Sequence, residues 1–327
     1  MPASCYRYQN IEGEFMKYIG SMILCLSMCM LFSAGTIHAD EESDARMALY
    51  KKTSAITDIP WEYLAAVDQY ERQVHDDPKE GRVTAIEADP MFWTGSAGEM
   101  PSPFFPEGWG SDGNGDQKVQ LDNDEDVLFS IGTYLKSYGT TSEDIKIALW
   151  NYYKRDLTVQ TIMNTAEVFK KFQTVNLTNR DFPLPLQANY SYRSTWGDAR
   201  GFGGRRIHEG TDIFANYGVP VKSTTYGVVE MKGWNKFGGW RIGIRDIYNI
   251  YHYYAHLHSF SEDIKVGDIV QPGDVIGSVG ASGYGPPGTS GKFPPHLHYG
   301  MYQDNGKNEW SFDPYPFLRK WERMTKN

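Results

Sequence analysis

Cysteine is almost absent from this chain of 327 residues, which contains only Cys5, Cys25 and Cys29. All three precede residue 30, so no disulfide can stabilise the remainder of the chain. No thiolate is available there as a nucleophile or as a metal ligand. Cysteine-dependent catalysis and cysteine-rich zinc sites are therefore excluded for most of the chain.

Positive charge is also scarce, because 41 acidic side chains outnumber 32 basic ones and give a formal net charge of −9. No cluster of lysine and arginine offers a stripe for phosphates, so the composition disfavours a nucleic-acid partner. Internal repeats and low-complexity tracts are lacking as well. Apolar residues make up 40% of the chain, which is enough for packed cores and argues against disorder. The length favours about two domains.

Long apolar runs are confined to the segment from Ile19 to Ile37, which has a basic residue before it and acidic residues after it. This pattern predicts a secretory signal peptide over residues 1–39. A true start at Met16 gives a cleaner signal, because the residues before it include two glutamates. The run is nearly long enough to span a bilayer, so an uncleaved membrane anchor is the alternative. We expect an exported protein, and the lack of cysteine suits one that faces a bacterial cell wall.

Residues 40–177 show helix-like apolar spacing and form the first predicted domain. Helices are expected from Trp61 to His75, from Asp126 to Tyr138, from Ser142 to Tyr153 and from Val159 to Phe172. Gly139 is a candidate C-cap for the second of these helices. Residues 178–188 contain two prolines and no periodicity, and they are the predicted linker.

Residues 189–327 form the second predicted domain, where short apolar runs alternate with glycine. The clearest runs are Gly227 to Met231, Arg241 to Ile244 and Ile269 to Gly277. Many short strands with turn signals indicate an all-β domain built on an antiparallel sheet. The predicted fold class is therefore α+β and multidomain.

Histidines and one aspartate recur in three short segments of this second domain. His208 and Asp212 are four residues apart, His256 lies in Tyr-Ala-His-Leu, and His296 and His298 are two residues apart. On a strand, spacings of two and four place side chains on one face. Two or three imidazoles with one carboxylate are typical zinc ligands, and an open fourth position suits catalysis. The pattern predicts a three-ligand metal site with two imidazoles left for proton transfer.

These segments, H-x-G-x-D, Y-x-H-L and H-L-H in this order, resemble the lysostaphin-type (LytM-like) zinc endopeptidases that cut peptides in peptidoglycan. The resemblance implies that His208, Asp212 and His298 bind one Zn²⁺ ion. It also implies that His256 and His296 are catalytic, and which of them acts as the general base stays open. Peptidoglycan is the expected partner. No small organic cofactor is expected, and a membrane contact is expected only through an uncleaved N-terminal segment.

Several neighbouring residues carry further expectations. His258 shares a strand face with His256 in an ideal strand, although the motif favours His256. Alternation turns Glu209 away from the site. Arg206 and Tyr284 are candidate substrate-binding residues, since an arginine can bind a carboxylate, and the alternative for Arg206 is a solvated surface residue. The long loop over residues 280–295 is expected to form one wall of the cleft.

The segment from Ile59 to Arg72 resembles the helix that carries the acid glutamate of lytic transglycosylases. This resemblance implies a lysozyme-like first domain, with Glu71 at the position of the acid. Arg72 stands where that family has serine, which favours a glycan-binding or structural role over catalysis.

The combination of signal, helical domain and long-looped peptidase domain resembles the sporulation-associated L-Ala–D-Glu endopeptidases of the family. It implies hydrolysis of stem peptides between L-alanine and D-glutamate, in the cell wall or the spore cortex. Two alternatives stay open. The enzyme could cut another wall peptide bond, such as a D,D cross-link, or the chain could be a non-catalytic wall-binding or activator protein.

Overall fold

The computed structural model describes residues 41–75, 81–87, 92–93, 108–201 and 206–326. The predicted signal over residues 1–39 and the alternative start at Met16 lie outside this range. No helix within the described residues is long and apolar enough to cross a membrane. The chain divides between Ala48 and Leu49 into two compact units. Of the first unit only residues 41–48 are described, and they are helical.

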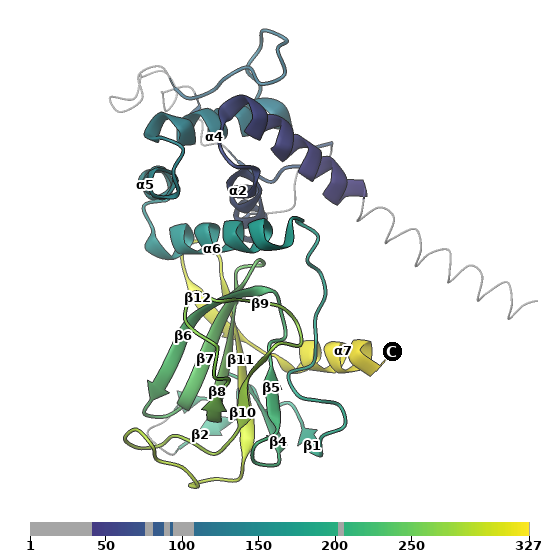
Figure 1. Ribbon diagram of the computed structural model, residues 1–327, viewed down its shortest axis with the longest axis vertical. Helices are drawn as coiled ribbons and strands as arrows, with labels where there is room; N and C mark the ends of the chain where they lie inside the picture. The colour runs from purple at the N-terminus through teal and green to yellow at the C-terminus, as the bar shows by residue number, and fades with distance from the viewer. Residues whose placement is uncertain (1–40, 76–80, 88–91, 94–107, 202–205, 327) are drawn as a thin grey trace, which may run out of the picture. The chain divides into compact units, whose positions relative to one another are not determined.

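The larger unit begins with a helical region (Figure 1). Its helices are α2 (Trp61–Val74), α4 (Asp124–Tyr138), α5 (Ser142–Tyr153) and α6 (Asp156–Phe172). These helices confirm the expected elements to within a few residues. Helix α4 begins earlier than expected because the Asn123 side chain accepts hydrogen bonds from two backbone N–H groups of its first turn. Gly139 lies at the C-cap of α4 as expected.

A single antiparallel sheet follows the helices. Its strands, with the separate β2–β3 pair, are β1 (Tyr190–Tyr192), β2 (Ala199–Arg200), β3 (Arg206–Ile207), β4 (Thr211–Ala215), β5 (Pro220–Lys222), β6 (Gly227–Asn235), β7 (Gly239–Asp246), β8 (Ile250–Phe260), β9 (Ile269–Val270), β10 (Val275–Val279), β11 (His296–Asp304) and β12 (Glu309–Phe312). The main order is β1-β4-β11-β8-β7-β6-β9, with β12 on β11 and with β10 between β5 and β8. The predicted antiparallel β-sheet is confirmed.

Strand β8 organises the sheet because its two halves have different neighbours. Its first half pairs with β11, and its last residues pair with β10. The apolar side chains of these strands enclose a core that includes Ile242, Tyr254 and Leu297. Phe182 and Leu184, which precede the first strand, are fully buried in the same core. The sheet is therefore held together with the segment that leads into it.

The sheet is followed by a helix that the all-β prediction for residues 189–327 did not include. Helix α7 (Tyr315–Lys326) buries Leu318 and Trp321, which are three residues apart and therefore lie on one face. Burial of a side chain of this size contributes about 1.5–3 kcal/mol, which explains why this short segment packs as a helix. The prediction was wrong here because one turn of apolar spacing is a weak signal.

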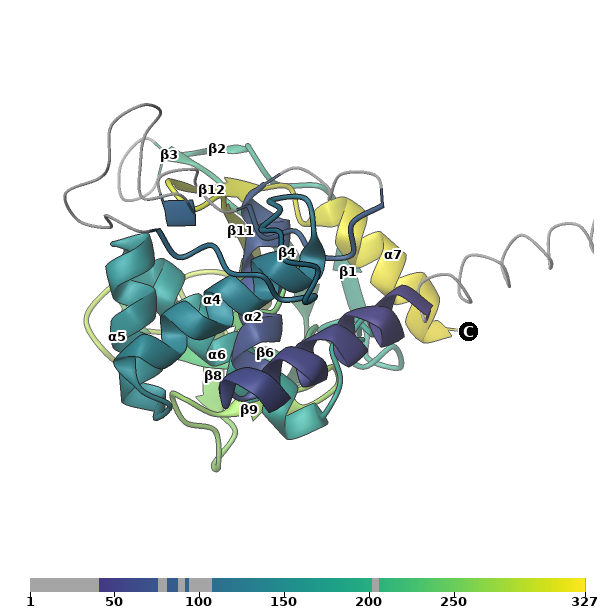
Figure 2. The same cartoon turned by 90° about the horizontal axis from the view of Figure 1, so that it is seen from above.

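Helix α6 packs against β6 at one end of the sheet (Figure 1), and the view from above in Figure 2 shows the helices lying over the sheet. The guanidinium group of Arg155, just before α6, donates two hydrogen bonds of 2.7 and 2.8 Å to the two carboxylate oxygens of Asp304, at the end of β11. Asn164 in α6 donates to Glu230 in β6 over 3.1 Å. A bidentate arginine–carboxylate contact has a defined geometry, so this pair fixes the orientation of α6 on the sheet.

Candidate metal centre and pocket

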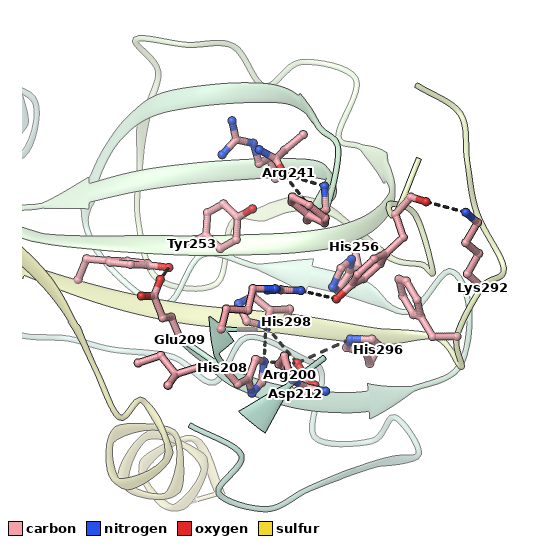
Figure 3. Close-up of a pocket in the computed structure, with 18 of the residues that line it drawn as sticks. Arg200, His208, Glu209, Asp212, Arg241, Tyr253, His256, Lys292, His296 and His298 are labelled. Atoms are coloured by element: carbon pink, nitrogen blue, oxygen red, sulfur yellow. Dashed lines mark hydrogen bonds and ion pairs between the residues drawn. The ribbon is translucent and has the colours of Figure 1, made fainter. Parts of the chain in front are cut away.

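Strands β4 and β11 bring a histidine and an aspartate together as direct neighbours. Asp212 on β4 is paired in register with His298 on β11. Asp212 Oδ1 lies 3.1 Å from His298 Nδ1 and 3.0 Å from His208 Nε2. One ligand atom from each of the three residues lies within 4.8 Å of the others. This arrangement could hold one metal ion (Figure 3).

The approach of His208 differs from the one expected. His208 and Asp212 do not share a strand, because the chain bends over residues 208–210 between β3 and β4. Gly210 in this segment lies close against β11. A Cβ atom there would lie 2.6 Å from His298 Cε1 and 2.6 Å from the carbonyl oxygen of Tyr299. The glycine of H-x-G-x-D therefore leaves room for the imidazole ring of His298.

We expect the Gly210→Ala variant to bind metal about 10–100-fold more weakly, which is the usual effect of disturbing the surroundings of a ligand. The added methyl group must displace either the His298 ring or the β11 backbone. Titration of the apoprotein with zinc against a competing chelator measures the change. Gly233→Ala is the matched control, since a Cβ atom there meets nothing within 4 Å. Equal affinities in the two variants would contradict this account.

Thr195, which the sequence did not single out, positions two residues of this cluster. Its carbonyl oxygen lies 2.7 Å from His208 Nδ1 and can only accept, so His208 carries a proton on Nδ1 and directs a lone pair on Nε2 toward Asp212. The backbone N–H of Asp212 donates to the Thr195 hydroxyl over 3.0 Å. Such contacts behind a ligand fix its tautomer and orientation.

Arg200 on β2 is the second residue that the sequence did not reveal. Its Nη2 atom lies 2.5 Å from Asp212 Oδ2. Burial alone raises the pKa of Asp212, but the adjacent imidazoles of His208 and His298 outweigh it and hold this pKa far below its usual range. Asp212 is therefore ionised, as a metal ligand must be.

The two histidines left over lie beside this cluster. The ring centroids of His256 and His296 are 4.8 Å apart. His256 Nδ1 lies 2.8 Å from the carbonyl oxygen of Ser282, and His296 Nδ1 lies 2.9 Å from that of Pro294. Carbonyl groups accept only, so both rings carry the proton on Nδ1 and leave the Nε2 lone pair available. His296 Nε2 is 3.7 Å from Asp212 Oδ1, which places it at the edge of the cluster.

Burial, the largest cause, lowers the pKa of His256 well below its usual value. Burial also lowers the pKa of His296, although nearby Asp212 acts in the opposite direction. Both imidazoles are therefore neutral near pH 7 and able to accept a proton.

A β-bulge places His256, and not His258, on the wall of the pocket. Trp240 pairs with Leu257 and Ile242 with Tyr254, so two residues of β8 lie opposite one residue of β7. His256 occupies this bulge with a φ of 63°, a left-handed conformation that is uncommon for a residue other than glycine. His258 instead packs its ring 4.5 Å from Tyr217 and does not line the pocket. The expectation of a shared strand face was wrong because the bulge breaks the alternation.

A cavity of about 790 Å³ opens over the cluster and its two neighbouring histidines. Lys292, Phe293 and Pro294 of the long loop form part of its wall, together with Tyr284. Arg206 donates to the Tyr284 hydroxyl over 2.6 Å, so both candidate substrate-binding residues line this cavity and contact each other. Glu209 lines it as well, contrary to the expectation from strand alternation, because residue 209 lies in the bend rather than on a strand.

Comparison with known proteins supplies the family. The sequence model of peptidase family M23 matches residues 206–314. The L-Ala–D-Glu endopeptidase of Bacillus subtilis is 57% identical over 319 residues, which cover 94% of this chain and 98% of that protein. The chain belongs to peptidase family M23. The resemblance to lysostaphin-type enzymes and the predicted class, a metalloendopeptidase, are thereby confirmed.

Other proteins match a smaller share of the chain. Lysostaphin of Staphylococcus staphylolyticus is 36% identical over 115 residues, which are 35% of this chain and 22% of that protein. The crystal structure of the catalytic domain of lysostaphin from Staphylococcus simulans is 33% identical, covers 40% of this chain and 93% of that domain, and has a TM-score of 0.33.

The M23 peptidases are zinc enzymes, and the residues present fit that ion. Two imidazoles and one ionised carboxylate are a typical set of ligands for catalytic zinc. The His208 ring is held in the tautomer that presents Nε2 to the cluster. The candidate acid of the helical region, Glu71, lies elsewhere. It is buried, it accepts a hydrogen bond from the Tyr153 hydroxyl, and its other carboxylate oxygen lies 2.8 Å from His75 Nε2.

Proposed function

We propose that this M23 peptidase is a zinc-dependent endopeptidase that hydrolyses peptidoglycan stem peptides between L-alanine and D-glutamate. The observation that carries the proposal is the 57% identity to an L-Ala–D-Glu endopeptidase along 98% of that protein. The match covers 94% of the chain and therefore extends beyond residues 206–314, which the family model matches. A cavity with the required ligands and proton-transfer groups supports the same reaction.

His208, Asp212 and His298 would hold one Zn²⁺ ion. The ion, when bound, would polarise the scissile carbonyl and lower the pKa of water to about 7. The protein contributes a fixed set of donors, with the His208 tautomer set by Thr195 and the Asp212 carboxylate kept ionised by the adjacent imidazoles. These features organise the site before substrate enters.

His256 and His296 would move the protons. A neutral imidazole with a lone pair on Nε2 can accept the proton of the attacking water. The resulting imidazolium can stabilise the oxyanion or protonate the leaving amine of D-glutamate. Both rings have the same tautomer and similar burial. Each of them can therefore serve as the proton acceptor or as the group that stabilises the oxyanion.

For the helical region we propose a lysozyme-like fold that binds glycan or orients the peptidase without catalysis of its own. The geometry around Glu71 supports this choice, because both carboxylate oxygens contact other side chains and the group is buried. A glycosidase acid must instead face a cleft that receives the sugar. The contact between Arg155 and Asp304 would transmit such an orientation to the sheet.

We further propose that the protein is exported and acts on the cell wall or the spore cortex. Its segment from Ile19 to Ile37 suits a signal or an anchor, and peptidoglycan lies outside the cytoplasmic membrane. The proposed domains are a helical region over residues 40–177 and a peptidase domain over residues 189–327. Residues 178–188 form the proposed linker between them.

Digestion of purified muropeptides and mass analysis of the products test the proposed bond. Cleavage between L-alanine and D-glutamate should leave disaccharides that carry one alanine, and should release the rest of the stem as a peptide. Cleavage of a D,D cross-link would instead turn dimers into monomers with intact stems. A wall-binding or activator protein would leave the masses of the muropeptides unchanged. The His208→Ala variant is the control that shows the masses expected without hydrolysis.

A further inference from the structure

Arg241 on β7 differs from the other basic residues that line the cavity. Arg200 is paired with Asp212, Arg206 donates to the Tyr284 hydroxyl, and Lys292 donates to the Tyr284 carbonyl over 2.6 Å. Among the residues that the structure describes, Arg241 interacts with the Tyr253 side chain but has no carboxylate in an ion pair, and its Nε atom is buried without a partner. Arg200 Nε and Arg245 Nη1 are also buried without a partner, so the feature that distinguishes Arg241 is the lack of a carboxylate. A guanidinium with buried donors and no carboxylate favours a ligand that supplies one.

The strand geometry directs Arg241 into the cavity. Ile242, its neighbour on β7, points into the core of the sheet, so Arg241 points to the opposite face. Arg241 lies opposite the bulge that holds His256, next to a proposed catalytic group. In Figure 3 it lies with Tyr253 on the side of the pocket opposite Asp212 and Arg200. Its guanidinium carbon is 5.8 Å from the Tyr253 ring centroid, a contact that restricts where the group can move.

Arg245, four residues further along β7 and on the same face, shows an arginine for which this fold supplies carboxylates. Its guanidinium lies 3.1 Å from Glu230 and 2.9 Å from Glu309. The chain therefore provides two carboxylates for Arg245, and the described residues provide none for Arg241. The missing carboxylate is the one that a substrate would supply.

The substrate of the proposed function has such a group. Glutamate carries two carboxyl groups, and continuation of a linear peptide uses only one of them. The residue that donates the nitrogen of an L-Ala–D-Glu bond therefore presents a free carboxylate close to the scissile amide. We propose that Arg241 binds this carboxylate and thereby selects D-glutamate on the leaving side of the scissile bond.

The proposal rests on the proposed function, and it specifies how the substrate is oriented in the cavity. The D-glutamate half lies toward Arg241 and Tyr253, and the L-alanine half lies toward the opposite side of the cavity. A guanidinium can bind a carboxylate through two parallel hydrogen bonds, which fixes the orientation of the group as well as its position. The scissile carbonyl is thereby oriented relative to His256.

The test uses two muropeptide stems that differ only in the free carboxyl group of D-glutamate, which is a carboxylate in one and a primary amide in the other. The wild-type enzyme should prefer the carboxylate by about 10–100-fold in kcat/KM, the usual effect of one charge-assisted contact. Arg241→Met should lose this preference, because its rate falls on the carboxylate stem and stays similar on the amide stem. Arg241→Lys should recover part of it.

Lys292→Met is the matched control, since it removes a positive charge from the same cavity. It should change kcat/KM by the same factor on both stems. Calorimetric binding of the released D-glutamyl peptide to zinc-depleted protein gives a readout apart from catalysis. Wild type should bind it about 10-fold more tightly than Arg241→Met. Equal losses on both stems, or equal binding of the product, would overturn the proposal. If wild type cut neither stem the proposed bond would fail, and product binding would still decide the role of Arg241.

Discussion

The Asp212→Ala variant is expected to lose bound zinc and all measurable hydrolysis together. Asp212 contacts His208 and His298 through one oxygen and Arg200 through the other, so it is the centre of the proposed ligand set. Without this carboxylate, two imidazoles remain beside an arginine whose charge repels a cation. Metal analysis of the purified variant and the muropeptide digest measure the two losses.

Glu209→Gln is the matched control for this experiment. Glu209 is a second carboxylate on the wall of the same cavity, and its only described side-chain contact is a 3.4 Å hydrogen bond from Tyr302. This variant should keep one zinc ion for each chain. Thermal unfolding of both variants without metal separates the loss of the ion from a loss of the fold. Stoichiometric zinc in a folded Asp212→Ala protein would show that the ligand assignment is wrong.

The second large effect is expected from His256→Ala, which should lower kcat by about 10²–10⁴-fold while zinc content stays unchanged. His256 donates from Nδ1 to the Ser282 carbonyl and is not among the three clustered ligand residues. Its removal takes away a neutral imidazole that can accept a proton at the cavity, and leaves the ligands in place. Single-turnover kinetics with a defined stem peptide, together with metal analysis, measure both quantities.

His258→Ala provides the comparison, because it removes an imidazole only two residues away. That ring packs against Tyr217 at the surface, so this variant should keep the activity of wild type. Comparable losses of kcat in the two variants would show that His256 has no catalytic role distinct from that of His258.

The spacing of histidine and aspartate predicted which five residues the structure brings together. Strand alternation was sufficient for His296 and His298, which lie on one face of β11. It failed at His256 and Glu209, because a bulge and a bend change the direction of the chain at those two points. Local alternation carries no information on such irregularities, and the positive φ of His256 has no signature in the sequence.

Thr195, Arg200 and Arg241 were missed for a different reason. Each contributes through a contact with a residue distant along the chain, and the register of the sheet sets these contacts. Helix α7 was missed because its apolar face consists of few residues. By contrast, helices α4 and α5 have capping residues and regular periodicity, so local chemistry alone located them. The roles of the site residues stay predictions until the variants above are measured.

Near its two ends, the loop over residues 280–295 accepts hydrogen bonds from Nδ1 of His256 and of His296, through the carbonyl oxygens of Ser282 and Pro294. Lengthening or shortening the chain between these two anchors would reshape the cavity wall and leave both tautomers intact. The segment from Gly283 to Phe293 is therefore a natural place for variation among relatives and for loop grafting in the laboratory. Grafts that keep both anchors should exchange substrate preference while the proton-transfer machinery is preserved.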